Sequence, residues 1–440
     1  MDNKVILQRL GIILAFPLAY AYVRLILSAS FGEFTIDPSQ GAGHFLIAFS
    51  YPLFALMFIL VNELVRRGRR GTNELSKESV FWYTMTFLTG LTAAFGPSEI
   101  LSVFAMHLCA VYSVLVSNKV LLGGKTSGFI IADLIDGFHV KAFAGFPNFV
   151  VDWRCFGRQK TDNEAVPAPR KSRFGVVLFV ISMIILLIIS ISLMASIDED
   201  IALFFSKMMK GIDDYFSSIN IDEFFYRFIL AIPVCFYLYG LISRTSKSDG
   251  AREKKVGSWL NRIRGKGKTA SATVVYIAAG IFVALYILFF IKRLAYMLGG
   301  FVGNVPEGTL VSHYAREGFF ELVGIMAVNM CVYLAIILFG STDSEGKFAL
   351  PAKILVTLLM AESIIFAIVA MSKLGLYYSI YGYTPKRILA MWGTLTLGFA
   401  SFMTILTVNR SKPHIRAGII FTAMSYVAIC VLSGVLESIS

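Results

Sequence analysis

Long apolar runs are the feature of this sequence that most restricts its fold, and the clearest extends from Phe174 to Ser196 without one charged residue. A helix of about 20 apolar residues crosses the hydrocarbon core of a bilayer. Within lipid, a helix pairs its backbone N–H and C=O groups internally. Charged residues make up only 15% of the chain, against about 25% in soluble domains. The sequence therefore predicts an all-α, polytopic integral membrane helix bundle.

Eleven apolar runs have the length and composition of transmembrane helices. They lie at residues 10–28, 45–61, 80–95, 99–117, 174–196, 224–243, 273–298, 314–340, 354–372, 385–408 and 417–436. Between the fourth and fifth runs, residues 129–143 mix acidic and apolar side chains, which is typical of an amphipathic helix in the membrane interface. The chain then divides into four transmembrane helices (1–117), the interfacial helix with a cytoplasmic linker (118–173), and seven transmembrane helices (174–440).

Lys and Arg, which outnumber Asp and Glu to give a net charge of +12, gather in the loops that follow every second predicted helix. One predicted basic loop begins with Arg66, Arg67, Arg69 and Arg70. Because cytoplasmic loops are enriched in cations, the alternation predicts a cytoplasmic N-terminus and an external C-terminus. It also explains the positive charge without nucleic acid, for which the chain carries no binding motif.

Two predicted outer segments carry cations against this rule, one near Arg316 and the other from Lys373 to Arg387. Carboxylates accompany them, and Glu362 lies near the middle of a predicted transmembrane helix. A charge beside or within lipid is costly and usually serves a function or a pairing. The candidate site therefore comprises Arg316, Glu317, Glu321, Glu362, Lys373, Tyr377, Tyr381 and Arg387.

Helical spacing groups these residues. Glu317 and Glu321 are four apart and share one face. Glu362 and Lys373 are eleven apart, so they share a face about 16 Å apart along the axis. Tyr377 and Tyr381 continue that face if the helix runs on.

The next helix has a favourable start at Thr384-Pro385, because threonine caps a helix and proline suits its first position. Lys386 and Arg387 then fall in the first turn, where the helix dipole disfavours cations. An acidic neighbour is expected to compensate them.

Two interpretations of the charged residues remain open. In the first, they line an outward-facing pocket for an anionic solute or a lipid headgroup. In the second, they pair with one another and hold the helices together, while tyrosines form an interfacial belt.

The motif Tyr-x-Arg-x-Gly-Phe-x-Glu-Leu at residues 314–322, followed by Leu-Tyr and Tyr-Gly-Tyr-Thr at 376–384 and then by Arg387, carries a resemblance. It resembles a bacterial integral-membrane family of unknown function, the domain-of-unknown-function family numbered four-one-seven-three. The resemblance covers about residues 314–392, and the family usually has two arginines where this chain has Ser372 and Lys373. It implies a bacterial cytoplasmic (inner) membrane protein and no particular activity.

Other chemistries have little support. The five histidines and five cysteines show no metal-ligand spacing, so no metal and no cofactor are expected. A membrane glycosyltransferase that uses the carboxylates of the predicted outer loops is the enzymatic alternative. Those carboxylates are Glu33, Asp37, Asp198, Glu199 and Asp200.

The sequence thus leaves enzymatic activity open and favours a non-catalytic protein. The first hypothesis is binding or transport of an anionic solute or lipid through the charged pocket, with membrane lipids as partners. The alternative is an envelope sensor or scaffold that acts on protein partners through its cytoplasmic loops.

Overall fold

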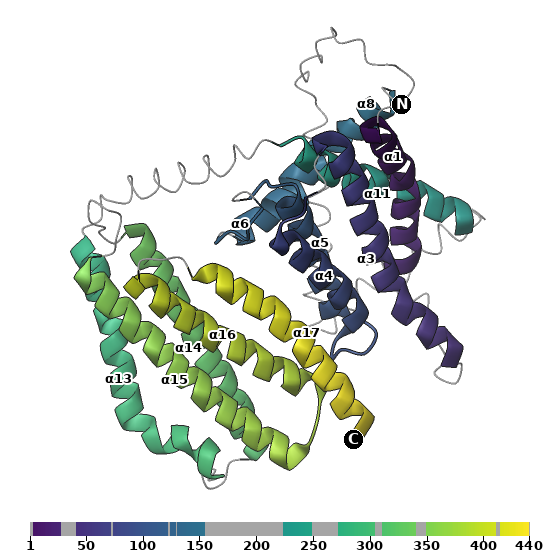
Figure 1. Ribbon diagram of the computed structural model, residues 1–440. Coiled ribbons are helices and arrows are strands. Elements are labelled where there is room, and N and C mark those ends of the chain that lie inside the picture. Colours follow the sequence, from purple (N-terminus) through teal and green to yellow (C-terminus); the bar gives the residue numbers. More distant parts are fainter. Residues whose placement is uncertain are drawn as a thin grey trace, which may run out of the picture. The chain divides into compact units, whose positions relative to one another are not determined.

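The computed structural model describes residues 3–27, 41–71, 74–121, 124–128, 130–154, 223–248, 272–303, 310–339, 349–410 and 414–439. Every regular element in this part of the chain is a helix, so the all-α prediction is confirmed (Figure 1). Nine of the described helices are long and apolar enough to cross a membrane. The predicted helix at 174–196 lies outside the described residues, and α4, with 16 residues, is shorter than the other nine.

The helices follow one another along the chain with these bounds: α1 Asn3–Tyr22, the π-helix η1 Val23–Leu27, α3 Gly41–Arg70, α4 Lys77–Thr92, α5 Glu99–Ser117, α6 Ile130–Ile135, the π-helix η2 Asp136–Lys141, α7 Ala142–Ala144, α8 Phe146–Arg154, α11 Glu223–Ser246, α13 Ala272–Val302, α14 Val311–Phe339, α15 Leu350–Tyr381, α16 Pro385–Arg410 and α17 Ile415–Ile439.

The chain forms two compact units. The first comprises residues 1–91, 104–125 and 129–249, and the second comprises 92–103, 126–128 and 250–440. The division of the sequence at residues 117 and 173 stays a prediction. In the structure, α11 packs within the first unit, against α1, α3, α7 and α8.

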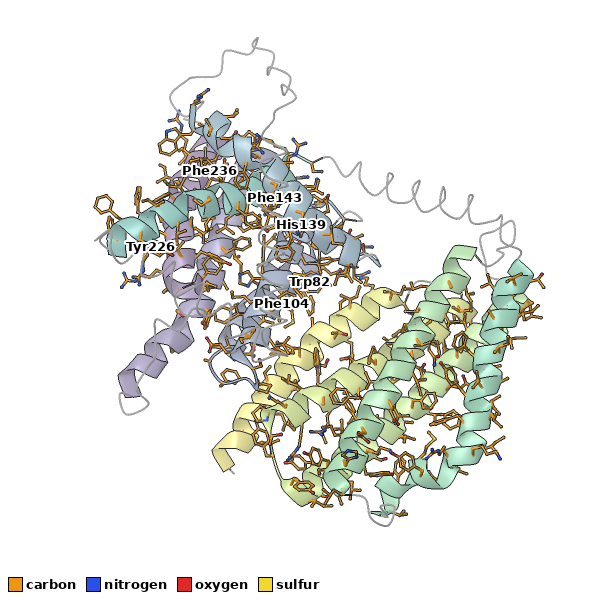
Figure 2. All side chains as sticks on the ribbon, turned by 180° about the vertical axis from the view of Figure 1, so that it is seen from behind. Trp82, Phe104, His139, Phe143, Tyr226 and Phe236 are labelled. Carbon is orange, nitrogen blue, oxygen red and sulfur yellow. The ribbon has the colours of Figure 1, made fainter. Side chains whose placement is uncertain are left out.

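Short helices cover part of α11 in the first unit. The segment predicted as one interfacial helix is helical from Ile130 to Ala144, with the π-helical stretch η2 in its middle, and α8 follows after a turn at Gly145. Phe143 and Phe236 belong to an aromatic layer between these helices and α11 (Figure 2). Phe146 stacks on both rings, with centroids 5.6 and 5.9 Å away. The position of this segment at a membrane interface stays a prediction.

The arginines that follow the second apolar run lie in the last two turns of α3, so the prediction of a basic loop there is wrong. Arg66 is only 1% exposed, and its guanidinium donates two hydrogen bonds to the Glu63 carboxylate, at 2.8 and 2.7 Å. Glu63 also accepts a hydrogen bond from Arg67 at 3.1 Å and one from Tyr83 of α4 at 2.6 Å. Pairs three and four residues apart support a helix, so α3 continues to Arg70.

Asp152 of α8 joins three segments of the first unit. Its carboxylate accepts hydrogen bonds from Arg69 of α3 and from Tyr239 and Ser243 of α11, the last two at 2.9 and 3.2 Å. Lys247 Nζ, just after α11, lies 3.4 Å from the other carboxylate oxygen. Burial and the Arg69 charge lower the pKa of Lys247, and Asp152 opposes that shift. The side chains of Arg69 and Asp152 are 8% and 9% exposed, so this is a buried pair.

Helix α15 is the centre of the second unit. It packs against α13, α14 and α16, and α16 packs against α17. Such a position suits a helix that is apolar on all sides. With 32 residues, α15 is about 48 Å long, which exceeds the roughly 30 Å hydrocarbon core. If α15 spans the bilayer, its ends reach the headgroup regions and its middle, near Glu362, lies at the depth of the lipid tails.

Candidate ligand-binding site

Lys373 lies within α15, and its side chain is fully buried between two tyrosines. The ammonium is 3.8 Å from the ring centroid of Tyr296 in α13 and 3.9 Å from that of Tyr314 in α14. Tyr314 Oη donates a hydrogen bond to the Tyr296 carbonyl at 2.5 Å, which holds the two rings in place. Lys373 Nζ has no hydrogen-bond partner among the described residues, so the faces of the rings are its direct support. This contact joins three helices at one end of the second unit.

Gly318 of α14 makes room for this ammonium, because a β-carbon there would overlap Lys373 Nζ. Gly318→Ala is expected to push the ammonium off the tyrosines and lower the free energy of unfolding by about 1–3 kcal/mol. In a Lys373→Ala background the same change is expected to cost nothing, since alanine favours a helix over glycine by about 1 kcal/mol. Unfolding of the four proteins in mixed detergent micelles measures the coupling. Equal costs in both backgrounds would show that the two side chains do not compete for space.

Arg387, in the first turn of α16, packs on the end of α15. Its guanidinium carbon lies 4.1 Å from the ring centroid of Tyr377 and 5.8 Å from that of Tyr381. Arg387 also donates hydrogen bonds to the carbonyls of Tyr381 and Gly382, which belong to the negative end of the α15 dipole. Gly382 has a φ of +72°, which suits glycine at the end of the helix. Within the described residues no carboxylate pairs with Arg387, and the acidic neighbour stays a prediction.

The remaining charges of this end are exposed. Arg316, Glu317 and Glu321 all project from the first turns of α14. Glu317 pairs with His313 at 3.0 Å, and Glu321 is near enough to interact electrostatically with Lys373. Arg316 has no carboxylate partner among the described residues. The structure thus brings five of the eight candidate residues into two cation-centred groups and leaves Arg316 and Glu317 at the surface.

Glu362, the eighth residue, lies away from the others within the bundle and is 7% exposed. The regularity of α15 from Leu350 to Tyr381 keeps Glu362 about 16 Å from Lys373 along the axis, as its spacing predicts. Glu362 therefore forms a site of its own.

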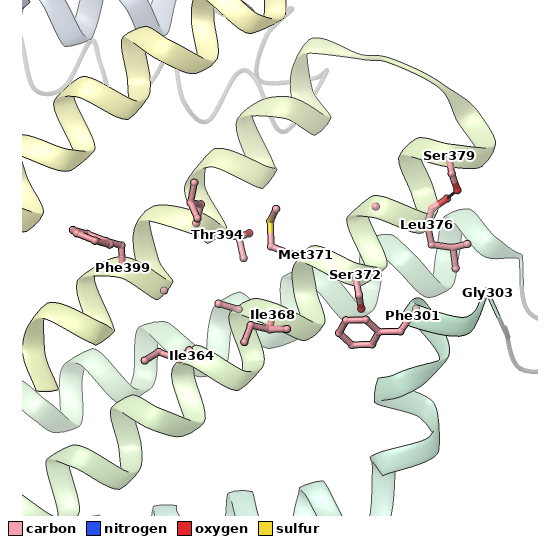
Figure 3. Close-up of a pocket in the computed structure, with 15 residues that line it drawn as sticks. Phe301, Gly303, Ile364, Ile368, Met371, Ser372, Leu376, Ser379, Thr394 and Phe399 are labelled. Atoms are coloured by element: carbon pink, nitrogen blue, oxygen red, sulfur yellow. Dashed lines mark hydrogen bonds between the residues drawn. The ribbon is translucent and has the colours of Figure 1, made fainter.

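A groove of about 750 Å³ opens beside α15 (Figure 3), and Lys373 does not line it. Its walls come from the end of α13, from α15 and from α16. None of the eight residues chosen from the sequence lines it. The lining consists of Gly300, Phe301, Gly303, Ile364, Ala367, Ile368, Met371, Ser372, Gly375, Leu376, Ser379, Thr394, Leu395, Gly398 and Phe399.

The polar side chains of the groove are already engaged. The hydroxyls of Ser372, Ser379 and Thr394 each donate a hydrogen bond to a carbonyl of their own helix, at 2.8 to 2.9 Å. What the groove offers to a ligand is therefore mainly aliphatic and aromatic carbon. A hydrocarbon chain fits this lining better than a polar solute. No group of metal-ligating side chains occurs in the part of the chain that the structure describes.

Comparison with known proteins places the chain in a family. A family model described as "Domain of unknown function (DUF4153)" matches residues 83–435, about four-fifths of the sequence. The chain belongs to this family. The match to DUF4153 includes the motif at 314–392, so the resemblance to a family of unknown function is confirmed. The family number expected from the motif, four-one-seven-three, differs from that of the matching family. No curated protein and no solved structure gives a significant match.

Sequence reasoning missed several residues of this DUF4153 protein that the structure makes prominent. Tyr296 escapes notice because one tyrosine at the end of an apolar helix is typical of any interfacial belt. Asn329, buried in the middle of α14, is a detectable signal, since an amide within a transmembrane run needs a partner. The groove residues are small or aliphatic and give no signal in a single sequence.

Proposed function

We propose that this DUF4153 protein binds an anionic amphiphile of the membrane, with the hydrocarbon chain in the groove beside α15 and the headgroup near Arg387. The observation that carries the proposal is the groove itself, an apolar space of about 750 Å³ with its hydroxyls turned to their own helices. Its position between membrane-spanning helices suits a lipid.

Arg387 is suited to hold the headgroup. It precedes Thr394, a groove residue, by seven positions, so both lie on one face of α16 about 10 Å apart along the axis. The hydrogen bonds of Arg387 to the described residues use Nη1, which leaves Nη2 and Nε to bind an anion such as a phosphate. Lys386 is exposed beside it.

We extend the proposal to the orientation of the chain in the membrane. With eleven transmembrane helices, a cytoplasmic N-terminus and an external C-terminus, the Arg387 end of the second unit faces outward. We place the protein in the bacterial cytoplasmic membrane, where phospholipids with phosphate headgroups surround it. Transport of the bound amphiphile is a further step of the same hypothesis.

Native mass spectrometry of the purified protein, supplied with phosphatidylglycerol or phosphatidylcholine, tests the proposal. A β-carbon at Gly375 meets no other atom within 4 Å, so Gly375→Phe is expected to fill the groove and lower lipid occupancy about tenfold, or ~1.4 kcal/mol. Gly324→Phe is the matched control, since Gly324 of α14 is also unobstructed and lies outside the groove. Arg387→Gln is expected to remove the preference for the anionic lipid. Equal occupancy in the two phenylalanine variants contradicts the proposal.

The two alternatives depend on segments that the structure describes only in part. The carboxylates of a glycosyltransferase, Glu33, Asp37 and 198–200, lie outside the described residues. A sensor or scaffold would act through cytoplasmic surfaces. Arg66 and Arg69 of one predicted basic loop are buried in internal pairs, and the predicted basic segments 155–173 and 249–271 lie outside the described residues.

A further inference from the structure

A polar cluster at mid-bundle of the second unit contains two buried acceptors that lack partners. Asn329 of α14 is fully buried, and its Nδ2 donates to Ser363 Oγ at 2.8 Å and to the Leu359 carbonyl at 3.3 Å. Ser363 Oγ in turn donates to the same carbonyl at 3.0 Å. The amide and hydroxyl donors of the cluster are therefore in use. Asn329 Oδ1 and Glu362 Oε2 remain without a hydrogen-bond partner among the described residues.

The orientation of the Asn329 amide follows from these contacts. Its nitrogen faces a backbone carbonyl, which can only accept a hydrogen bond, so exchanging the amide oxygen and nitrogen would set two acceptors against each other. Oδ1 is thus an acceptor in need of a donor. Leaving a buried acceptor unsatisfied costs about 1–3 kcal/mol.

Glu362 is placed to be that donor. Asn329 donates to Leu359 and to Ser363 of α15, and Glu362 lies between these two residues in the same helical turn. No described cation forms an ion pair with Glu362, and Tyr286 of α13 is a titratable neighbour that interacts with it electrostatically. Asn329 is the polar residue on α14 in this cluster, and Lys373 lies three turns further along α15. A carboxylate here has only acceptors to offer, whereas a carboxylic acid has one O–H donor.

We infer that Glu362 is a proton-binding site within the membrane and that its protonated form donates a hydrogen bond to Asn329 Oδ1. Binding forms one O–H bond on the carboxylate, and release returns that proton to water. One proton satisfies both open acceptors at once. When the proton leaves, the charged Glu362 carboxylate faces the Asn329 oxygen, which is also an acceptor, in an apolar region. This repulsion weakens the packing of α14 on α15. Proton release is thereby coupled to the separation of these helices. This inference is independent of the lipid groove.

Infrared spectroscopy of the full chain in lipid vesicles tests the inference. At neutral pH the wild type is expected to show the carbonyl band of a hydrogen-bonded carboxylic acid, and Glu362→Gln is expected to lack it. Asn329→Leu removes the acceptor and is expected to shift the band. Glu321→Gln is the control, because it makes the same change on an exposed glutamate of α14.

A chemical probe gives a second readout that does not depend on band assignment. Dicyclohexylcarbodiimide is apolar and reacts with protonated carboxyl groups in membranes. The peptide containing Glu362 is expected to be labelled in the wild type, to lose labelling as the pH rises, and to be unlabelled in Glu362→Gln. Identical infrared spectra of wild type and Glu362→Gln at every pH overturn the inference. It is also overturned if Na⁺ or K⁺ at fixed pH abolishes the band and the labelling, since the site would then bind a metal cation.

Discussion

Asp152→Ala is expected to lower the free energy of unfolding by about 3–5 kcal/mol, the range found when one partner of a buried ion pair is removed. Arg69 would remain 8% exposed without its carboxylate. Tyr239 and Ser243 would lose the acceptor that they share with Arg69. Because Asp152 joins α8 to α3 and α11, its loss also loosens the short helix from the first unit. Unfolding by a denaturing detergent in mixed micelles, followed by helical circular dichroism, measures the change.

Two milder variants separate charge from connectivity at this site. Asp152→Asn retains an oxygen acceptor for Tyr239 and Ser243 and is expected to be less damaging than alanine. Lys247→Gln is expected to cost less than about 1 kcal/mol, because the Lys247 side chain is 38% exposed and exposed ion pairs contribute little. A cost below about 1 kcal/mol for Asp152→Ala as well would mean that solvent replaces the pair.

Hydrophobic patterning was sufficient for the class of fold and for many helices. Pro385 begins α16, as its local sequence predicts, whereas α15 continues to Tyr381, past the predicted end of its apolar run at residue 372. Patterning could not locate the end of α3, because the apolar run ends at Val61 and the charged residues that follow it have the composition of a loop. The helix continues through charged residues to Arg70 because Glu63 and Asp152 neutralise them. Glu63 is visible at helical spacing, whereas Asp152 is 83 residues from Arg69 and no local pattern connects them.

The candidate site shows the same contrast. The sequence singled out Lys373, Arg387 and Glu362 because a charge in an apolar run is costly wherever the fold places it. It could not distinguish a cation that binds a ligand from one that lies between two tyrosine rings, because Tyr296 and Tyr314 come from other helices. The groove is a property of three helices together and has no charge to mark it. The cost of a charge within an apolar run thus identifies the candidate residues, but only the packing of the neighbouring helices shows what each of them contacts.

Glu63→Ala is expected to destabilise the protein by a similar amount, about 3–5 kcal/mol, because it removes the carboxylate of a buried arginine. Arg66, 1% exposed, would lose both hydrogen bonds from its guanidinium to Glu63. Tyr83 would lose its acceptor on α3, although it also accepts a hydrogen bond from Asn62 at 2.6 Å. Asn62 donates as well to Ser117 of α5 at 3.1 Å, so the damage extends to the contacts among α3, α4 and α5.

The double variant Glu63→Ala/Arg66→Met distinguishes a buried pair from a solvated one. Replacing both partners of a buried pair by apolar groups is often neutral, whereas removing one leaves an uncompensated charge. Arg66→Met is therefore expected to recover at least about 1 kcal/mol of the loss caused by Glu63→Ala. If the two changes instead add, Arg66 keeps its charge compensated without Glu63, through the Glu74 carbonyl at 3.4 Å and its other neighbours. Additive costs would mean that the hydrogen bonds of Tyr83 and Asn62 stabilise this network more than the Arg66–Glu63 pair does. Asn62→Leu would then be expected to destabilise the protein more than Glu63→Ala.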